Sequence, residues 1–141
     1  MEIKKTRTIE TSSTVVWNVL TKPEHIEKWL GVKAESDWNM DSELLFKFTW
    51  DGKEFVDKGK IIGFNRNEVF AYTYWSNFSG LTDQPENYSK IKFELVNKGG
   101  KTLLELTHSN IKNKLMYEHS DKNWEETLDQ IKNIAESIEN K

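Results

Sequence analysis

The fold is decided near the C-terminus, by residues 124–138, WEETLDQIKNIAESI. In this stretch apolar side chains recur at steps of four, three, four and three residues: Trp124, Leu128, Ile131, Ala135 and Ile138. The spacing predicts an amphipathic helix with one continuous apolar stripe. We expect Ser120 or Asp121 to cap it, and a helix of about 20 residues would span roughly 30 Å. A stripe of this length needs a broad apolar surface to cover it.

The segments before this helix alternate with a period of two, which is typical of half-buried strands. Asp51-Gly52 and Lys98-Gly99-Gly100-Lys101 read as hairpin turns, and Asn65-Arg66-Asn67 reads as another turn. We therefore predict strands at residues 2–11, 44–50, 53–63, 68–75 and 89–97, and a last strand that carries Leu104, Leu106 and His108.

Two short helices are expected between the first and second strands. Ser12-Ser13 offers an N-cap for a helix that carries Val16, Trp17, Val19 and Leu20. Pro23 suits the first turn of the second helix, and Gly31 suits its C-terminal end. The pattern predicts an α+β domain over residues 1–141, a curved antiparallel sheet of about six to seven strands around the long C-terminal helix.

Composition excludes several classes of function. The net charge is −3 with Lys and Glu interspersed, so no basic stripe is present for a nucleic acid. Cysteine is absent, which excludes disulfides and thiolate chemistry. No apolar stretch reaches the length of a membrane span, and the first residues lack a signal-like apolar segment. We therefore expect a cytoplasmic location.

Several short motifs, in this order and spacing, carry a resemblance to a known family. They are Val16-Trp17-Asn18-Val19-Leu20-Thr21-Lys22-Pro23-Glu24, Trp29, Asp37-Trp38, Asp57-Lys58-Gly59-Lys60-Ile61, Tyr72-Thr73-Tyr74-Trp75-Ser76, Thr107-His108 and Glu118-His119-Ser120-Asp121-Lys122-Asn123-Trp124. The chain resembles the START-like (SRPBCC) superfamily, and within it the bacterial stand-alone domains related to the C-terminal domain of the Hsp90 ATPase activator Aha1. Asp41-Ser42 and Asn123 depart from the pattern, because such domains often carry Gly there.

The resemblance implies a helix-grip fold with a hydrophobic cavity between the concave sheet face and the C-terminal helix. The superfamily includes lipid carriers, receptors, cyclases and co-chaperones, so the fold alone does not assign an activity. The candidate ligand-binding residues are the large side chains expected to face inward: Trp38, Phe46, Phe48, Trp50, Tyr72, Tyr74, Phe93, Leu106, His108, Trp124 and Leu128. The alternative for each is that it fills the core.

Catalytic and metal chemistry find little support in the sequence. Asp57 and His108 form the one candidate acid–base pair, and a polar pair that satisfies itself in the core is the simpler interpretation. The three histidines, His25, His108 and His119, lack the spacing of a metal site, and no phosphate loop is present. We expect neither a metal nor a cofactor.

Residues 76–88 form a connection far longer than a usual hairpin loop. This loop is either a lid over a cavity or a packed surface loop held by Phe78, Leu81 and Tyr88. Two functions remain: a non-catalytic binding protein for a small hydrophobic or amphipathic ligand, and a protein-interaction module that assists a chaperone. A cyclase-type or dehydratase-type enzyme ranks third, and the oligomeric state is left open.

Overall fold

One antiparallel sheet forms the framework, with the strand order β1-β7-β6-β5-β4-β3-β2. The computed structural model describes residues 1–138. The strands are β1 (Ile3–Ile9), β2 (Lys33–Ser36), β3 (Glu43–Trp50), β4 (Lys53–Asn65), β5 (Val69–Tyr74), β6 (Ser89–Asn97) and β7 (Thr102–Ser109). The predicted strands and hairpin turns are confirmed, with differences of a few residues at their ends.

The helices are α1 (Ser13–Thr21), α2 (Pro23–Leu30) and α3 (Lys114–Ser137), and a 3₁₀ turn, η1, covers Pro85–Asn87. Their local signals act as expected. The Ser12 side chain accepts a hydrogen bond from the Val15 N–H at the start of α1. Pro23 opens α2, and Gly31 ends it in the left-handed conformation, with φ 76°.

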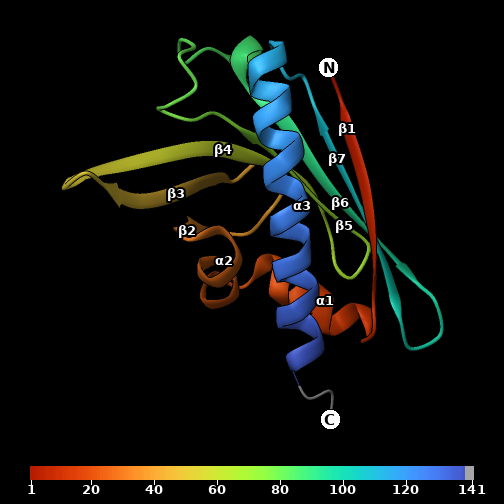
Figure 1. Ribbon diagram of the computed structural model, residues 1–141. Coiled ribbons are helices and arrows are strands. Elements are labelled where there is room, and N and C mark those ends of the chain that lie inside the picture. Colours follow the sequence, from red (N-terminus) through yellow and green to blue (C-terminus); the bar gives the residue numbers. More distant parts are fainter. Residues whose placement is uncertain (139–141) are drawn as a thin grey trace.

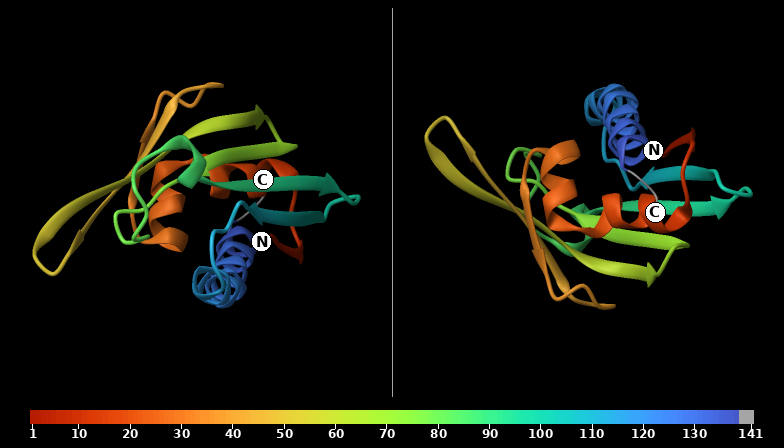
Figure 2. Two further views of the ribbon diagram at one scale, coloured as in Figure 1. Left: turned by 90° about the horizontal axis from the view of Figure 1, so that it is seen from above. Right: turned by 90° about the horizontal axis from the view of Figure 1, so that it is seen from below.

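Helix α3 crosses the concave face of the sheet, while α1 and α2 cover the same face beside it (Figure 1). Four of the five residues in the predicted stripe are buried: Trp124, Leu128, Ile131 and Ala135. The fifth, Ile138, follows the end of the helix and is partly buried against the core. Figure 2 shows the hairpin of β3 and β4 curving away from the other strands. The predicted α+β helix-grip fold is therefore confirmed.

The start of α3 differs from the prediction. The helix begins at Lys114, and its N-cap is Asn113, whose side chain accepts a hydrogen bond from the Met116 N–H at 2.9 Å. Ser120 and Asp121 lie inside the helix, so their expected capping role is wrong. The apolar periodicity does not predict this start, because Leu115 in the first turn is 78% exposed and does not continue the stripe.

Substituting Asn113 by alanine is expected to lower the free energy of unfolding by about 1 kcal/mol, the usual value of an N-cap hydrogen bond. Ser120→Ala is the matched control, because alanine is a good helix former at an interior position. Urea denaturation of both variants measures the difference. Equal stability losses in the two variants would contradict the assigned helix start.

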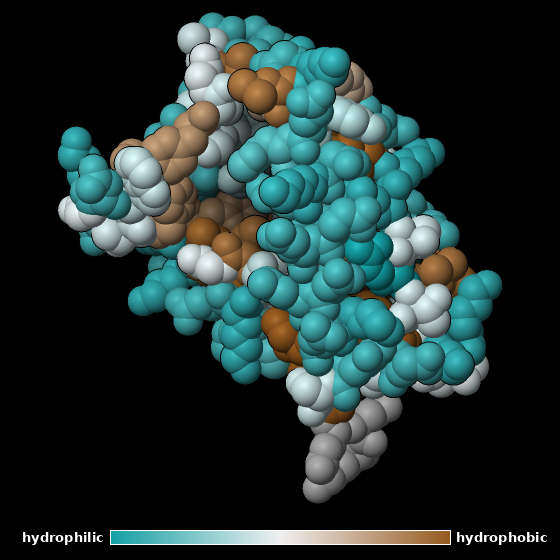
Figure 3. All heavy atoms as spheres, in the orientation of Figure 1, coloured by the Kyte–Doolittle hydropathy of each residue, from teal (hydrophilic) through white to brown (hydrophobic). Residues whose placement is uncertain are grey.

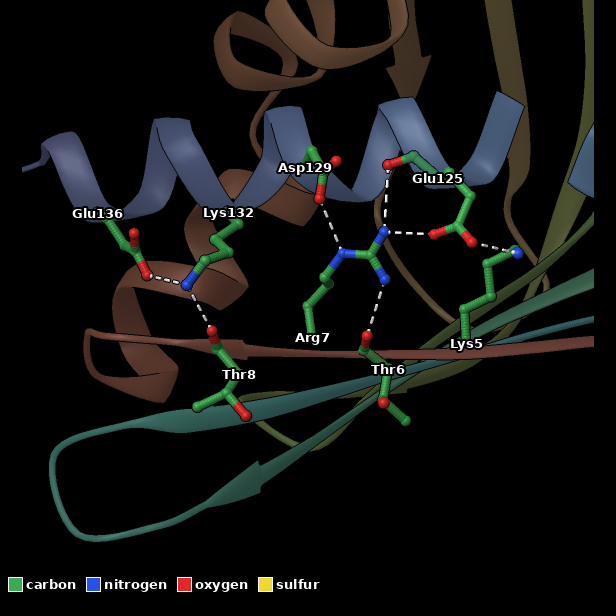
Figure 4. Close-up of polar contacts among 8 residues, drawn as sticks. All are labelled: Lys5, Thr6, Arg7, Thr8, Glu125, Asp129, Lys132 and Glu136. Carbon is green, nitrogen blue, oxygen red and sulfur yellow. Dashed lines mark hydrogen bonds and ion pairs between the residues drawn. The ribbon is translucent and has the colours of Figure 1, made fainter. Parts of the chain in front are cut away.

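Ion pairs fasten α3 to the edge strand β1 (Figure 4). Lys5 pairs with Asp121 and Glu125, and Arg7 pairs with Glu125 and Asp129. The hydrogen bonds from Arg7 and Lys5 hold the pKa of Glu125 below its ordinary value. The acidic residues Asp121, Glu125 and Asp129 therefore act in the middle of the helix, as partners of the sheet.

The hairpin of β3 and β4 projects beyond its neighbours. Strand β2 pairs with residues 44–47 of β3, and β5 pairs with β4 at residues 61–65, with one further bridge at Lys58. Within the part of the chain that the structure describes, the outer part of the hairpin therefore has only itself as a sheet partner. Trp50 shares the alternation of Leu44 and Phe46, yet it is 60% exposed at the hairpin tip. Its expected inward position is wrong.

Candidate functional site

The space between α3 and the middle of the sheet is filled by side chains. The ring centroids of Phe93 and Trp124 lie 5.8 Å apart, and Trp29 of α2 and Phe70 of β5 lie 6.1 and 6.4 Å from Phe93. Leu106 and Leu128, two further candidate ligand-binding residues, are buried as well. The apolar stripe of α3 therefore packs directly against the sheet and forms the protein core here.

His108 occupies the boundary of this core below Trp124. The Trp124 Nε1–H donates a hydrogen bond to His108 Nδ1 at 2.9 Å. Indole nitrogen is only a donor, so Nδ1 carries no proton and the imidazole proton lies on Nε2. Burial lowers the pKa of His108 to about 4, which keeps the ring neutral at pH 7.

A second aromatic group lies at the base of the projecting hairpin. The ring of Phe46 is 5.7 Å from that of Tyr72 and 5.6 Å from that of Tyr74. The Tyr74 hydroxyl donates a hydrogen bond to Asp57 Oδ2 at 2.7 Å. Burial, and then the Asp57 charge, raise the pKa of Tyr74, so its phenol stays protonated as a donor. Figure 3 shows a hollow with apolar atoms beside α3, on the side of the projecting hairpin.

The surface between the hairpin and the end of α2 is also hollowed. A depression of about 610 Å³ lies here, within the size range of ligand pockets. Its apolar lining includes Phe48, Phe55 and Val32, and its charged lining includes Lys33 and Lys47. Phe48 is therefore placed at an open surface and is only partly buried.

Aromatic residues of the hairpin meet residues 76–88 at the outer end. Phe78 lies 4.8 Å from Phe55, 5.8 Å from Phe48 and 5.5 Å from Trp50, measured between ring centroids. Phe78 is nevertheless 54% exposed. We call Phe48, Trp50, Phe55 and Phe78 the hairpin cluster. The alternation of β4 places Phe55 on the face of Asp57, so this member could have been found from the sequence.

The 76–88 loop is anchored at its beginning and its end. Asp57 Oδ1 accepts hydrogen bonds from the Asn77 backbone N–H at 3.0 Å and from its Nδ2 at 3.1 Å. Tyr88 stacks on Trp75, and its hydroxyl donates to Asp83 at 2.5 Å. The sequence did not predict Asn77 as a site residue, because the loop after β5 is what brings it next to Asp57.

The candidate acid–base pair is not assembled. Asp57 lies on β4 and His108 on β7, with β5 and β6 between them, which corresponds to about 14 Å at the usual strand spacing. Each side chain has other hydrogen-bond partners. Within residues 1–138, no group of three His, Asp or Glu side chains could hold a metal ion.

Trp38 lies at the edge of the core. It lies in the connection between β2 and β3 with φ 58°, a left-handed conformation that is uncommon for a large residue. Its ring packs 6.2 Å from Phe70, and it lines a depression of about 370 Å³ with Trp17, Phe64 and Arg66. Trp38 therefore contacts the core through Phe70, apart from the candidates Phe46, Phe48 and Trp50 of the hairpin.

Comparison with known proteins assigns the family. A family profile described as activator of Hsp90 ATPase homolog 1-like protein matches residues 10–136. No curated protein matches the chain. No helix within residues 1–138 is both long and apolar enough to cross a membrane.

Solved structures agree with the profile. The solution structure of ChR145 from Cytophaga hutchinsonii is 30% identical, with a TM-score of 0.84, 97% of this chain and 94% of that chain covered. The Aha1 dimer from Colwellia psychrerythraea is 20% identical, with a TM-score of 0.77 and 96% of each chain covered. PFC0360w, an HSP90 activator from Plasmodium falciparum, is 20% identical, with a TM-score of 0.74 and 95% of each chain covered. The chain therefore belongs to the activator of Hsp90 ATPase homolog 1-like family and has the START-like fold that its sequence resembles.

Proposed function

We propose that the protein binds a small hydrophobic molecule without catalysis, in the hollow at the base of the β3–β4 hairpin. The observation that carries this proposal is the apolar hollow beside α3 (Figure 3). Apolar pockets with a few placed polar groups are the usual form of small-molecule sites. Phe46, Tyr72 and Tyr74 supply aromatic surface near it, and the separation of Asp57 from His108 argues against acid–base catalysis.

The site lies on the hairpin side of the cavity that the superfamily resemblance implies. Trp124 and Leu128 pack against the sheet as core residues. The ligand would instead contact the inner face of the hairpin, where Phe48 is partly buried. The 76–88 loop would close the outer end through Phe78.

The test is a ligand screen with fatty acids, sterols, alkyl ketones and flavonoid-like aromatics. At least one class should raise the melting temperature and quench tryptophan fluorescence. Phe48→Ala should weaken binding of that class about tenfold, because a large apolar contact is removed. Val96→Ala, on an exposed position of β6, is the matched control and should bind as the wild type does. No thermal shift with any class would refute the proposal.

A second function, chaperone assistance, has its own observation. Trp50 and Phe78 are large, exposed and adjacent, as in protein-docking surfaces. Two similar structures are those of an Aha1 dimer and of an HSP90 activator, and they favour an Hsp90 chaperone as the partner.

This second function is tested with purified Hsp90 from the source organism. Stimulation of its ATPase rate by the protein, lost in Trp50→Ala with Phe78→Ala, would support it. An unchanged ATPase rate with the wild-type protein would exclude it.

A further inference from the structure

Two polar atoms on the concave face have no protein partner within residues 1–138. They are the hydroxyl of Tyr72, a residue 3% exposed, and Nε2 of His108, a residue 7% exposed. Of the fully enclosed side-chain nitrogens and oxygens, only His25 Nδ1 and Asn67 Oδ1 lack partners in this part of the chain. The Tyr72 hydroxyl and His108 Nε2 therefore each border accessible space, although their residues are almost buried.

The sheet register places these two side chains in one row. Tyr72 of β5 is paired with Ile91 of β6, and Ile91 is paired with His108 of β7. Directly paired residues point to the same face of a sheet. Both polar atoms therefore belong to the concave face that α3 and the hairpin enclose, and Phe46 packs against Tyr72 from the hairpin side.

The hydrogen-bonding character of both atoms is fixed. The bond from Trp124 Nε1 occupies His108 Nδ1, so Nε2–H is a donor. Burial raises the pKa of Tyr72, so its hydroxyl also keeps its proton. Water satisfies a donor poorly in a nearly buried position, so a ligand that supplies an acceptor to either atom gains a hydrogen bond.

The charges on this face disfavour an anion. The two cations of β1 that point toward α3, Lys5 and Arg7, are already paired with Asp121, Glu125 and Asp129. Asp57 adds a carboxylate near the hairpin, and His108 is neutral at pH 7. Burial of a carboxylate without a cationic partner is unfavourable. A neutral oxygen meets no such penalty.

We propose that the bound molecule carries a neutral oxygen, as in a ketone, that accepts a hydrogen bond from His108 Nε2–H or the Tyr72 hydroxyl. The ligand is therefore an oxygenated apolar molecule rather than a fatty acid. This inference rests on the proposed small-molecule function and specifies its ligand class.

The test compares two probes of equal chain length, 2-nonanone and nonanoate, at pH 7.5 by tryptophan fluorescence. We expect 2-nonanone to bind at least about tenfold more tightly. Tyr72→Phe removes only the hydroxyl, and His108→Asn keeps an acceptor for Trp124 while it removes Nε2–H. At least one of them should weaken 2-nonanone binding about fivefold, the usual range for one buried hydrogen bond.

An infrared measurement separates this role from a structural one. The carbonyl band of bound 2-nonanone should shift to lower frequency in the wild type, and the shift should be lost in the variant that weakens binding. Nonanoate binding as tight as that of the ketone, or an unchanged carbonyl band, would overturn the inference and leave the proposed function standing. A screen in which no hydrophobic class binds would overturn both.

Discussion

Replacing Gly59 by alanine is expected to lower the free energy of unfolding by at least about 3 kcal/mol, the upper end of the range for overpacking. A Cβ atom built at Gly59 lies 1.6 Å from the carbonyl oxygen of Thr73 and 2.6 Å from its carbonyl carbon. These are backbone atoms of β5, so no side-chain rotation relieves the contact. Strands β4 and β5 would have to separate where Asp57 and Tyr74 hold the base of the hairpin.

Gly63→Ala is the matched control on the same strand. Its Cβ would meet the methyl groups of Ala71 and Val69 at 3.1 and 3.3 Å, which small shifts can relieve. We expect a loss of about 1 kcal/mol or less for this variant. Urea denaturation at pH 7.5 compares the two midpoints and slopes. Similar losses in both variants would show that the β4–β5 contact at Gly59 is not the constraint.

The fold could be predicted because its signals are local and repeated. The stripe from Trp124 to Ala135, the Asp51-Gly52 turn and the Pro23 and Gly31 helix ends each act within a few residues. The start of α3 could not be predicted from the same periodicity. Asn113 caps a first turn whose Leu115 is exposed, so the capping residue alone marks the boundary.

The site could be predicted only in part, because the alternation of apolar and polar residues shows which face of a strand a side chain occupies. It does not show which strands lie next to that strand. It correctly places Phe46, Tyr72 and His108 on one face. It does not reveal that β3 and β4 extend beyond β2 and β5, which exposes Trp50. It also does not reveal that two strands separate Asp57 from His108.

Acidification should destabilise the protein through His108. The ordinary pKa of histidine, about 6.5, applies to the unfolded chain, whereas burial lowers the pKa of folded His108 to about 4. Between these values the unfolded state binds a proton that the folded state does not, so the free energy of unfolding falls as the pH falls. The full difference is about 3 kcal/mol, and it is reached below pH 4. Above pH 6.5 both states are neutral at this position, and the effect disappears.

His108→Asn isolates this contribution, because asparagine can accept the Trp124 hydrogen bond and does not titrate. Hydrogen bonds from Arg7 to Glu125 and from Lys132 to Glu136 lower the pKa of those carboxyls and add acid sensitivity of their own. These contributions are common to wild type and variant, so the difference between the two curves reports on His108. His119→Asn, at an exposed position of α3, is the matched control. Urea denaturation from pH 8 to 4 should show the wild type and His119→Asn losing about 3 kcal/mol more than His108→Asn. Parallel curves for all three proteins would mean that folded His108 takes up a proton as readily as the unfolded chain does, which would contradict the lowered pKa that its burial causes.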